Sequence, residues 1–186
     1  MTVLVDWQLR DMIDRKYLKV LPLMEGGIQP NSIDVRLGNN FATYTGKAPI
    51  DPYDKESVLK DLMTIQSHEV TISRGAFLLA ETLEIVELPN NICATIMGKS
   101  SLARLGLSVH QTGGFIDCGF SGNITLEMTC ENDRPIILRT GMPIAQIIFM
   151  MTQRAEVPYH SRGEAKYAGQ KGVTASRFYM NKSIDI

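Results

Sequence analysis

The sequence predicts a mainly β protein that folds as one domain and carries only short helices. A chain of 186 residues suits a single domain. After Glu69, short runs rich in β-branched and aromatic residues follow one another, and each run ends at Gly, Pro, Asn or Asp. Because helical patterns are confined to one end, this arrangement favours a mostly antiparallel β-sandwich or barrel over an alternating β/α fold.

Two short helices are predicted before the β-rich region. Residues 6–18 are expected to form the first helix, capped by Asp6, because apolar residues recur there at intervals of three and four. Residues 54–63 are expected to form the second. The apolar stripe of the first helix consists of Leu9, Met12, Ile13 and Tyr17.

Strands are predicted on both sides of the second helix. The stretch IDVRL, residues 33–37, alternates apolar with charged side chains, which is typical of a half-buried strand. The later predicted strands are EVTIS (69–73), FLLAETLEIVEL (77–88), ICATIM (92–97), SVHQT (108–112), NITLEMTC (123–130), PIILR (135–139) and IAQIIFM (144–150).

Composition limits the partners and the compartment. Hydrophobic residues make up 44% and charged residues 21%, with a net charge of -1, so neither disorder nor a nucleic-acid partner is expected. Cys93, Cys118 and Cys130 lack C-x-x-C spacing, which argues against a disulfide framework and favours a reducing compartment. No apolar run of about 18 residues occurs, so we expect a cytoplasmic protein without a membrane span or signal peptide.

Two carboxylates stand out in the stretch HQTGGFIDCGFSGNITLEMT, residues 110–129. The strand period of two puts Glu127 on the polar face of its predicted strand, whereas Asp117 precedes a glycine-rich turn. These acids are candidates for a catalytic pair. A solvated strand glutamate and a turn aspartate that bonds its own backbone are the alternatives.

The tetrapeptide GKSS, residues 98–101, indicates an anion site instead of a Walker loop. A P-loop needs glycine where Cys93 stands. Here a strand ends at Met97 and a short helical run follows, so the serine amides and the charges of Lys99 and Arg104 could bind phosphate. A plain serine cap with two solvated cations is the alternative.

Zinc chemistry is not predicted. The strings H-x-E and P-C-x-x-C of zinc-dependent deaminases do not occur, and His68, His110 and His160 are scattered along the chain. We therefore expect no metal held by protein side chains, and we interpret His110 as a structural histidine.

The residues after Pro158 differ in composition from the rest of the chain. Basic residues and glycines dominate there, and aliphatic residues are few, so the segment is too polar to form core. A solvated chain end explains this composition. A lid over a charged ligand also explains it, because Tyr159, Lys166 and Gln170 combine an aromatic ring, a cation and an amide.

Five motifs in order resemble one family, the dCTP deaminases, which share a fold with the trimeric dUTPases. The resemblance implies a dUTPase-like β-sandwich or distorted barrel of the β-clip type over residues 1–157. It implies that residues 158–186 form a basic lid segment of the same domain. The motifs are QPNSIDVRLG (29–38), GKSSLARLGL (98–107), HQTGGFIDCGFSGNITLE (110–127), GMPIAQIIF (141–149) and PYHSRGEAKYAGQKGVTASR (158–177).

The resemblance also implies roles for individual residues. Glu127 matches the deamination glutamate, Asp117 the aspartate at the sugar 3′-hydroxyl, and Phe120 the aromatic residue under the deoxyribose. Ser100 is expected to help place the attacking water. The implied triphosphate cradle is Lys99, which replaces the usual arginine, with Ser100, Ser101 and Arg104. The other implied substrate contacts are Leu102, Ala103, His110, Gln111, Thr112, Thr125, Leu126, Gln146, Tyr159, Lys166 and Gln170.

The implied activity is deamination of dCTP to dUTP and ammonia, followed by hydrolysis to dUMP and pyrophosphate. TGGFID (112–117) is similar to the T-A-G-x-I-D of bifunctional members, and Gln146 stands where monofunctional bacterial members often have a small residue. Gly113 departs from both kinds, which have alanine. Deamination alone, dUTP hydrolysis alone and a catalytically idle nucleotide-binding regulator are the alternatives.

The implied partners are small molecules and further copies of the chain. Magnesium is expected to arrive on the triphosphate with few or no protein ligands, and no zinc is expected. The relatives are homotrimers with sites between subunits, so a homotrimer is expected here, with dCTP and dUTP as substrates and dTTP as an inhibitor. No nucleic-acid or membrane partner is expected.

Overall fold

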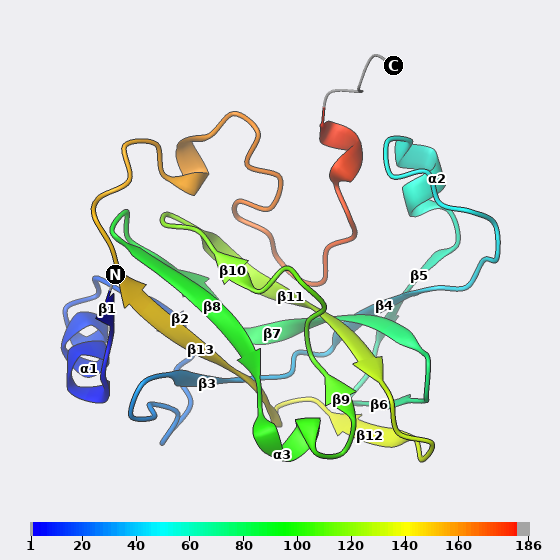
Figure 1. The fold of residues 1–186 in the computed structure, drawn as a ribbon, viewed down its shortest axis with the longest axis horizontal. Helices are drawn as coiled ribbons and strands as arrows, with labels where there is room; N and C mark the ends of the chain where they lie inside the picture. Colours follow the sequence, from blue (N-terminus) through cyan, green and yellow to red (C-terminus); the bar gives the residue numbers. More distant parts are fainter. Residues whose placement is uncertain (1, 182–186) are drawn as a thin grey trace.

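The computed structural model describes residues 2–181, which form two main β-sheets with short helices at their edges (Figure 1). The helices are α1 Asp6–Asp14, α2 Lys55–Leu59 and α3 Ser100–Ala103, with 3₁₀ turns at Tyr159–Ser161 and Phe178–Met180. The strands are β1 Thr2–Val3, β2 Lys19–Leu21, β3 Ile33–Arg36, β4 Asn40–Tyr44, β5 Leu62–Gln66, β6 Glu69–Ile72, β7 Phe77–Glu87, β8 Ile92–Gly98, β9 Leu107–Ser108, β10 Phe115–Ile116, β11 Ser121–Cys130, β12 Ile136–Arg139 and β13 Pro143–Met151.

The strand order confirms the predicted fold class. One sheet has the order β1-β13-β8-β10, with β3 also paired to β13, and the other has the order β5-β4-β7-β11-β9, with β2 also paired to β7. β12 and β6 form a separate ladder. Each ladder between these strands is antiparallel. The protein is therefore mainly β and built by antiparallel pairing, as the sequence predicts.

One hydrophobic core joins the two sheets. β13 contributes Ile147 and β11 contributes Leu126 and Met128, and all three side chains are fully buried. Successive residues of a strand point to opposite faces, so the residues between these positions are turned away from the core. On β11 this geometry leaves Thr125 and Glu127 facing outward, and it positions the site described below.

The first helix is shorter than predicted. Its N-cap is Val5, whose amide donates to the Gln8 side chain at 3.1 Å, so Asp6 lies in the first turn and not at the cap. The helix ends before Lys16, which adopts a left-handed φ of 58° that a helix cannot contain. The prediction of a helix over residues 6–18 is therefore wrong at its C-terminal end and in its cap.

Most other predicted elements are confirmed. The second helix, α2, lies within residues 54–63, and Asp54 caps it by accepting hydrogen bonds from the amides of Glu56 and Ser57. Its predicted C-terminal end is wrong, because Asp61 has a left-handed φ of 58° and Leu62 already begins β5. The predicted strands at 69–73, 77–88, 92–97, 123–130, 135–139 and 144–150 correspond to β6, β7, β8, β11, β12 and β13.

Two strand predictions need correction. The strand predicted at 108–112 stops at Ser108, because the following residues leave the sheet to form one wall of a cavity. In β3, Asp34 is only 5% exposed and does not lie on a solvated face. Its carboxylate is stabilised inside the protein by the Lys99 ammonium, 2.6 Å from Oδ2.

The C-terminal segment is folded onto the domain (Figure 1). Gln170 forms a parallel bridge with Gly122 of β11, and the Asn123 amide donates to the Gln170 carbonyl at 3.1 Å. The Gly169 amide donates to the Ser121 carbonyl at 2.8 Å. Residues 158–181 are therefore not a frayed, solvated chain end. Residue 1 of the predicted domain and residues 182–186 of the predicted lid lie outside the described residues.

Residues 2–181 contain no helix that is both long enough and apolar enough to cross a membrane.

Candidate active site

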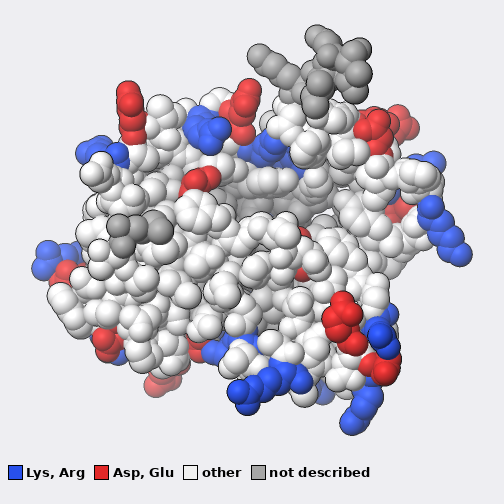
Figure 2. Space-filling model, viewed as in Figure 1, with Lys and Arg blue, Asp and Glu red and all other residues white. Residues whose placement is uncertain are grey.

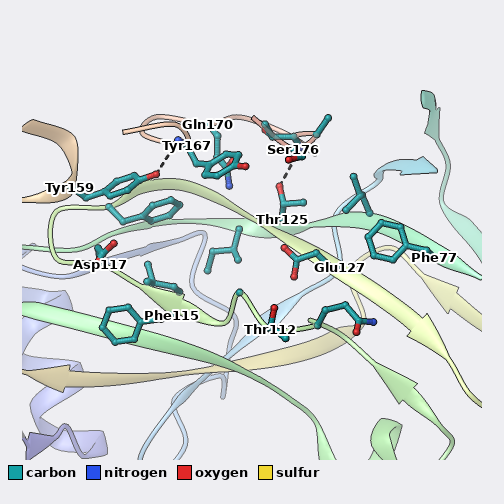
Figure 3. A pocket seen from close by; sticks show the side chains of 18 of the residues that line it. Phe77, Thr112, Phe115, Asp117, Thr125, Glu127, Tyr159, Tyr167, Gln170 and Ser176 are labelled. Carbon is teal, nitrogen blue, oxygen red and sulfur yellow. Dashed lines mark hydrogen bonds between the residues drawn. The ribbon is translucent and has the colours of Figure 1, made fainter. Parts of the chain in front are cut away.

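A cavity of about 600 Å³ opens between β11, the loop before β10 and the C-terminal segment (Figure 3). β11 supplies its floor, residues 111–117 supply one wall, and residues 159–176 supply another. Figure 2 shows a hollow on this face of the molecule, with cationic and acidic side chains around it. Cavities of roughly 300–1,000 Å³ are typical of small-molecule sites.

Glu127 lies on the cavity side of β11 (Figure 3). Its neighbours along the strand, Leu126 and Met128, are fully buried in the core, and its partner across the sheet is Leu79, which also lines the cavity. The predicted orientation of this strand is therefore confirmed. Because the carboxylate stands in a recess beside an apolar side chain, it is less well solvated than a glutamate on an open strand.

Burial raises the pKa of the Glu127 carboxyl above its ordinary value. Hydrogen bonds from the backbone of Gln111 and of Glu127 itself, and the nearby charge of His110 when protonated, partly oppose this rise. A carboxyl group whose pKa is moved toward neutrality is suited to accepting and returning a proton.

The raised pKa predicts the pH dependence of a reaction that uses Glu127 as a proton acceptor. Because the pKa is raised, the accepting carboxylate forms at a higher pH than it would in the ordinary glutamate range, near about 4.3. We expect the acidic limb of a kcat/KM profile to lie above that range and to disappear in Glu127→Gln. A limb at the ordinary glutamate pKa would contradict this assignment.

Asp117 and two aromatic rings form the other end of the cavity. Asp117 follows β10 and opens a turn in which its carbonyl accepts the Phe120 amide at 3.2 Å. The Phe120 ring lies 6.1 Å from the Tyr159 ring, centroid to centroid. The Tyr159 hydroxyl accepts the Tyr167 amide at 3.1 Å, which ties this end of the cavity to the C-terminal segment. Asp117 and Glu127 thus face one cavity from different elements (Figure 3).

The predicted phosphate-binding turn lies apart from this cavity within one chain. α3 is a single turn, because Gly106, with a φ of 85°, leads the chain away into β9. Lys99 and not a serine is the N-cap residue. The Lys99 ammonium pairs with Asp34, so in the free chain its charge is directed to a buried carboxylate. Neither Lys99 nor Arg104 lines the cavity.

The cavity gathers only part of the predicted site. The predicted residues that line it are Gln111, Thr112, Asp117, Phe120, Thr125, Glu127, Tyr159 and Gln170. Those that do not line it are Lys99, Ser100, Ser101, Leu102, Ala103, Arg104, His110, Leu126, Gln146 and Lys166.

Three of the predicted site residues that do not line the cavity make contacts elsewhere in the protein. Leu126 is fully buried on the core face of β11. The Gln146 side chain accepts a hydrogen bond from the Ser32 hydroxyl at 3.1 Å. The Lys166 ammonium donates to Asn181 at 2.5 Å and lies 5.6 Å from the centre of the Phe178 ring.

Sequence reasoning missed several residues that line the cavity. Tyr44 comes from β4 and Phe77 from the start of β7, and neither stands in a motif. Tyr167 and Ser176 come from the C-terminal segment, where only three residues were expected to act. The alternation of β4 could have suggested Tyr44 as an outward-facing residue, but no local signal places it beside Glu127.

The C-terminal segment reaches the cavity through a close approach to Gly122. A Cβ atom at Gly122 would lie 2.6 Å from the Gln170 carbonyl oxygen, and its φ of 147° is one that favours glycine. Gln170 is 8% exposed, and its side-chain amide donates to the Asn123 carbonyl at 2.5 Å. Its Oε1 is buried without a hydrogen-bond partner among the described residues.

The space beside Gly113 predicts a tolerated substitution. An added Cβ there would meet only Glu127 Oε1 at 3.9 Å, so we expect Gly113→Ala to change turnover by no more than about threefold. Gly114→Ala is the matched control, because its Cβ would lie 3.1 Å from the His110 ring and 3.2 Å from the Ile96 carbonyl. Steady-state rates of both variants test this, and a severe loss in Gly113→Ala would contradict it.

Side chains that commonly bind metals are dispersed over the described residues. Within residues 2–181, no group of three or more His, Cys, Asp or Glu side chains could hold a metal ion. Asp34, the acid beside the predicted phosphate turn, is already paired with Lys99.

Known proteins match the chain over nearly its whole length. A family model described as dCTP deaminase-like matches residues 3–152. A protein of Methanosphaerula palustris named "dCTP deaminase, dUMP-forming" is 52% identical over 181 residues, with 97% of each chain covered. A protein of Mycobacterium avium with the same name is 44% identical over 184 residues, covering 96% of this chain and 97% of that protein.

A solved structure shares the fold. The 2'-deoxycytidine 5'-triphosphate deaminase of Agrobacterium tumefaciens aligns with a TM-score of 0.64 at 24% identity, over 81% of this chain and 48% of that chain. The two-sheet architecture, the family model and the relatives agree, and the chain belongs to the dCTP deaminase-like family.

Proposed function

We propose that this protein is a dCTP deaminase that forms dUMP, acting in the cytoplasm on deoxynucleotides. The observation that carries the proposal is the partly buried Glu127 on the floor of a nucleotide-sized cavity, with a raised pKa and Asp117 at the opposite end. The names of relatives up to 52% identical over 97% of the chain support the same reaction.

Deamination needs a proton shuttle at the cytosine ring. Water attacking C4 must lose a proton while the ring nitrogen N3 gains one. A single carboxylate between them can accept the proton from water and donate it to N3. Glu127 would take one proton from the water and deliver it to N3. It would then pass the proton of the new C4 hydroxyl to the amino group, so that the C4–N bond breaks, ammonia leaves and the C4 carbonyl forms. General acid–base catalysis of this kind contributes about 10² to 10⁴-fold, so positioning and charge stabilisation must supply the rest.

The hydrolytic step would use the other end of the cavity. Asp117 would contact the sugar 3′-hydroxyl, with the Phe120 ring beneath the deoxyribose. From there Asp117 could also orient a water toward the α-phosphorus. Magnesium bound to the phosphates would offset the negative charge that develops as pyrophosphate leaves. dTTP, which has the same sugar and phosphates, would compete for the site as an inhibitor.

The triphosphate cradle would come from another copy of the chain. The turn with Lys99, Ser100, Ser101 and Arg104 lies outside the cavity, so one chain does not surround both ends of a nucleotide. A homotrimer would bring this turn of one subunit to the cavity of the next, and closed cyclic assemblies of this kind are common.

A shared site predicts complementation between inactive variants. Glu127→Gln and Arg104→Ala chains should each be inactive alone, but together in one trimer they should regain part of the activity. Some sites would then combine an intact Glu127 with an intact Arg104 from different subunits. Ammonia release by the co-purified mixture measures this. A monomeric protein, or mixed trimers without recovery, would contradict the shared site.

Separate incubations with dCTP and with dUTP test the proposed function. We expect ammonia in the incubation with dCTP but not in the one with dUTP, and we expect pyrophosphate in both. Ammonia without pyrophosphate would identify a deaminase only, and pyrophosphate from dUTP alone would identify a dUTPase. Binding of dTTP without turnover of either substrate would identify a nucleotide-binding regulator.

A further inference from the structure

Residues 45–61 form an excursion between β4 and β5, directly after Tyr44, which lines the cavity. Its base is closed where the Thr45 amide donates to the Asp61 carbonyl at 3.0 Å. Inside it, Asp51 accepts the Tyr53 amide through its side chain at 2.9 Å, and Asp54 caps α2. These hydrogen bonds fix the backbone from which the Tyr53 side chain projects.

The end of the C-terminal segment packs against this excursion. In Figure 1 the last 3₁₀ turn, in red, lies beside α2. The Tyr53 and Phe178 rings meet edge to face, with centroids 5.1 Å apart and planes at 76°. The Lys55 ammonium lies 5.9 Å from the centre of the Tyr179 ring. Both geometries are attractive for aromatic and cation–π pairs.

The docked end connects directly to the cavity wall. Phe178 follows Arg177, whose amide donates to the Tyr167 hydroxyl at 3.0 Å and whose guanidinium lies 5.9 Å from the centre of the Tyr167 ring. Tyr167 lines the cavity, and its own amide donates to the Tyr159 hydroxyl. A displacement of Phe178 would therefore move groups that contact the cavity.

We infer that Tyr53 and Lys55 are positioning residues: they hold the end of the C-terminal segment and so keep Tyr167, Gln170 and Ser176 over the cavity. The inference goes beyond the proposed function, but its effect on turnover rests on that function. Tyr53 itself does not line the cavity. It acts through the tail, and the excursion between β4 and β5 serves as the docking site of the lid.

Tryptic cleavage of the full-length protein tests the docking without any substrate. Cleavage after Lys171 requires the segment to open, because neighbouring amides are bonded to Asn123 and Thr125 of β11. We expect Tyr53→Ala to raise the initial rate of cleavage after Lys171, followed by mass spectrometry, by about fivefold. Tyr53→Phe, which keeps the ring, should leave that rate near the wild-type value.

A double-mutant cycle provides the matched control. Phe178→Ala should raise the same cleavage rate by a similar factor, and the double variant Tyr53→Ala with Phe178→Ala should be no faster than either single variant. Independent effects that multiply in the double variant, or wild-type rates in both single variants, would overturn the docking.

Kinetics with dCTP then separate positioning from simple stability. A lid that is docked for a smaller fraction of the time lowers apparent affinity, so we expect Tyr53→Ala to raise KM about three- to fivefold with kcat nearly unchanged. Faster cleavage with an unchanged KM would overturn the positioning role. If the wild-type protein does not turn over dCTP, the proposed function fails, but the cleavage cycle still decides whether Tyr53 docks the tail.

Discussion

Glu127→Gln is expected to reduce ammonia release from dCTP by about 10² to 10⁴-fold while nucleotide binding is largely retained. Glutamine keeps the size of the side chain and its capacity for hydrogen bonds, but it cannot take a proton from water and return it to a ring nitrogen. The loss should therefore fall on kcat, because the missing interaction is made only in the transition state. A sensitive ammonia assay with dCTP at saturating concentration measures it.

The control is the same change at a glutamate without a catalytic role. Glu131 lies just beyond the end of β11 and is exposed, so Glu131→Gln should leave the rate near the wild-type value. Binding of dCTP to Glu127→Gln, measured by calorimetry, separates lost chemistry from lost folding. A Glu127→Gln variant with normal ammonia release would refute the assignment of this residue.

Gly122→Ala is expected to reduce kcat/KM by about 100-fold, because it would push the C-terminal segment off the cavity. The new Cβ would lie 2.6 Å from the Gln170 carbonyl oxygen and 3.0 Å from its amide nitrogen, and neither backbone atom can yield without moving the segment. Misplacement of positioning groups by about 1 Å can cost this much in rate. The measurement is steady-state turnover of dCTP.

Gly141→Ala separates the close approach from the backbone strain. Gly141 also has a left-handed φ, 84°, but nothing lies within 4 Å of an added Cβ. Both substitutions cost strain of about 1–3 kcal/mol, and so both should lower the midpoint of thermal unfolding. Only Gly122→Ala should also lose activity, and equal activity in the two variants would contradict the role of the Gly122 contact.

The sequence predicted the structure most accurately where the alternation of apolar and polar residues along one strand decides which way side chains face. The alternation in β11 correctly predicted that Glu127 faces away from Leu126 and Met128. The same reasoning failed for Asp34, which alternation puts on a solvated face. Its burial depends on Lys99, which is far away in the chain, and a periodic pattern carries no information about such a partner.

Long-range packing explains the other misses. Tyr44 reaches the cavity because β4 pairs with β7, and the two segments are distant in sequence. The sequence around Tyr53 predicted only a short helix. Its contact with Phe178 joins two segments that lie before and after the β-rich region in the sequence. The residue types of the tail indicated a lid, but not the surface on which the lid is docked.

A time course with dCTP as the only nucleotide tests most directly the claim that one protein performs both reactions. Separation of dUTP from dUMP, with ammonia measured in the same samples, gives the order and the stoichiometry. We predict equal amounts of ammonia and dUMP, with pyrophosphate formed in step. Accumulation of dUTP without dUMP, or dCTP that stays intact, would contradict the proposed dUMP-forming deaminase.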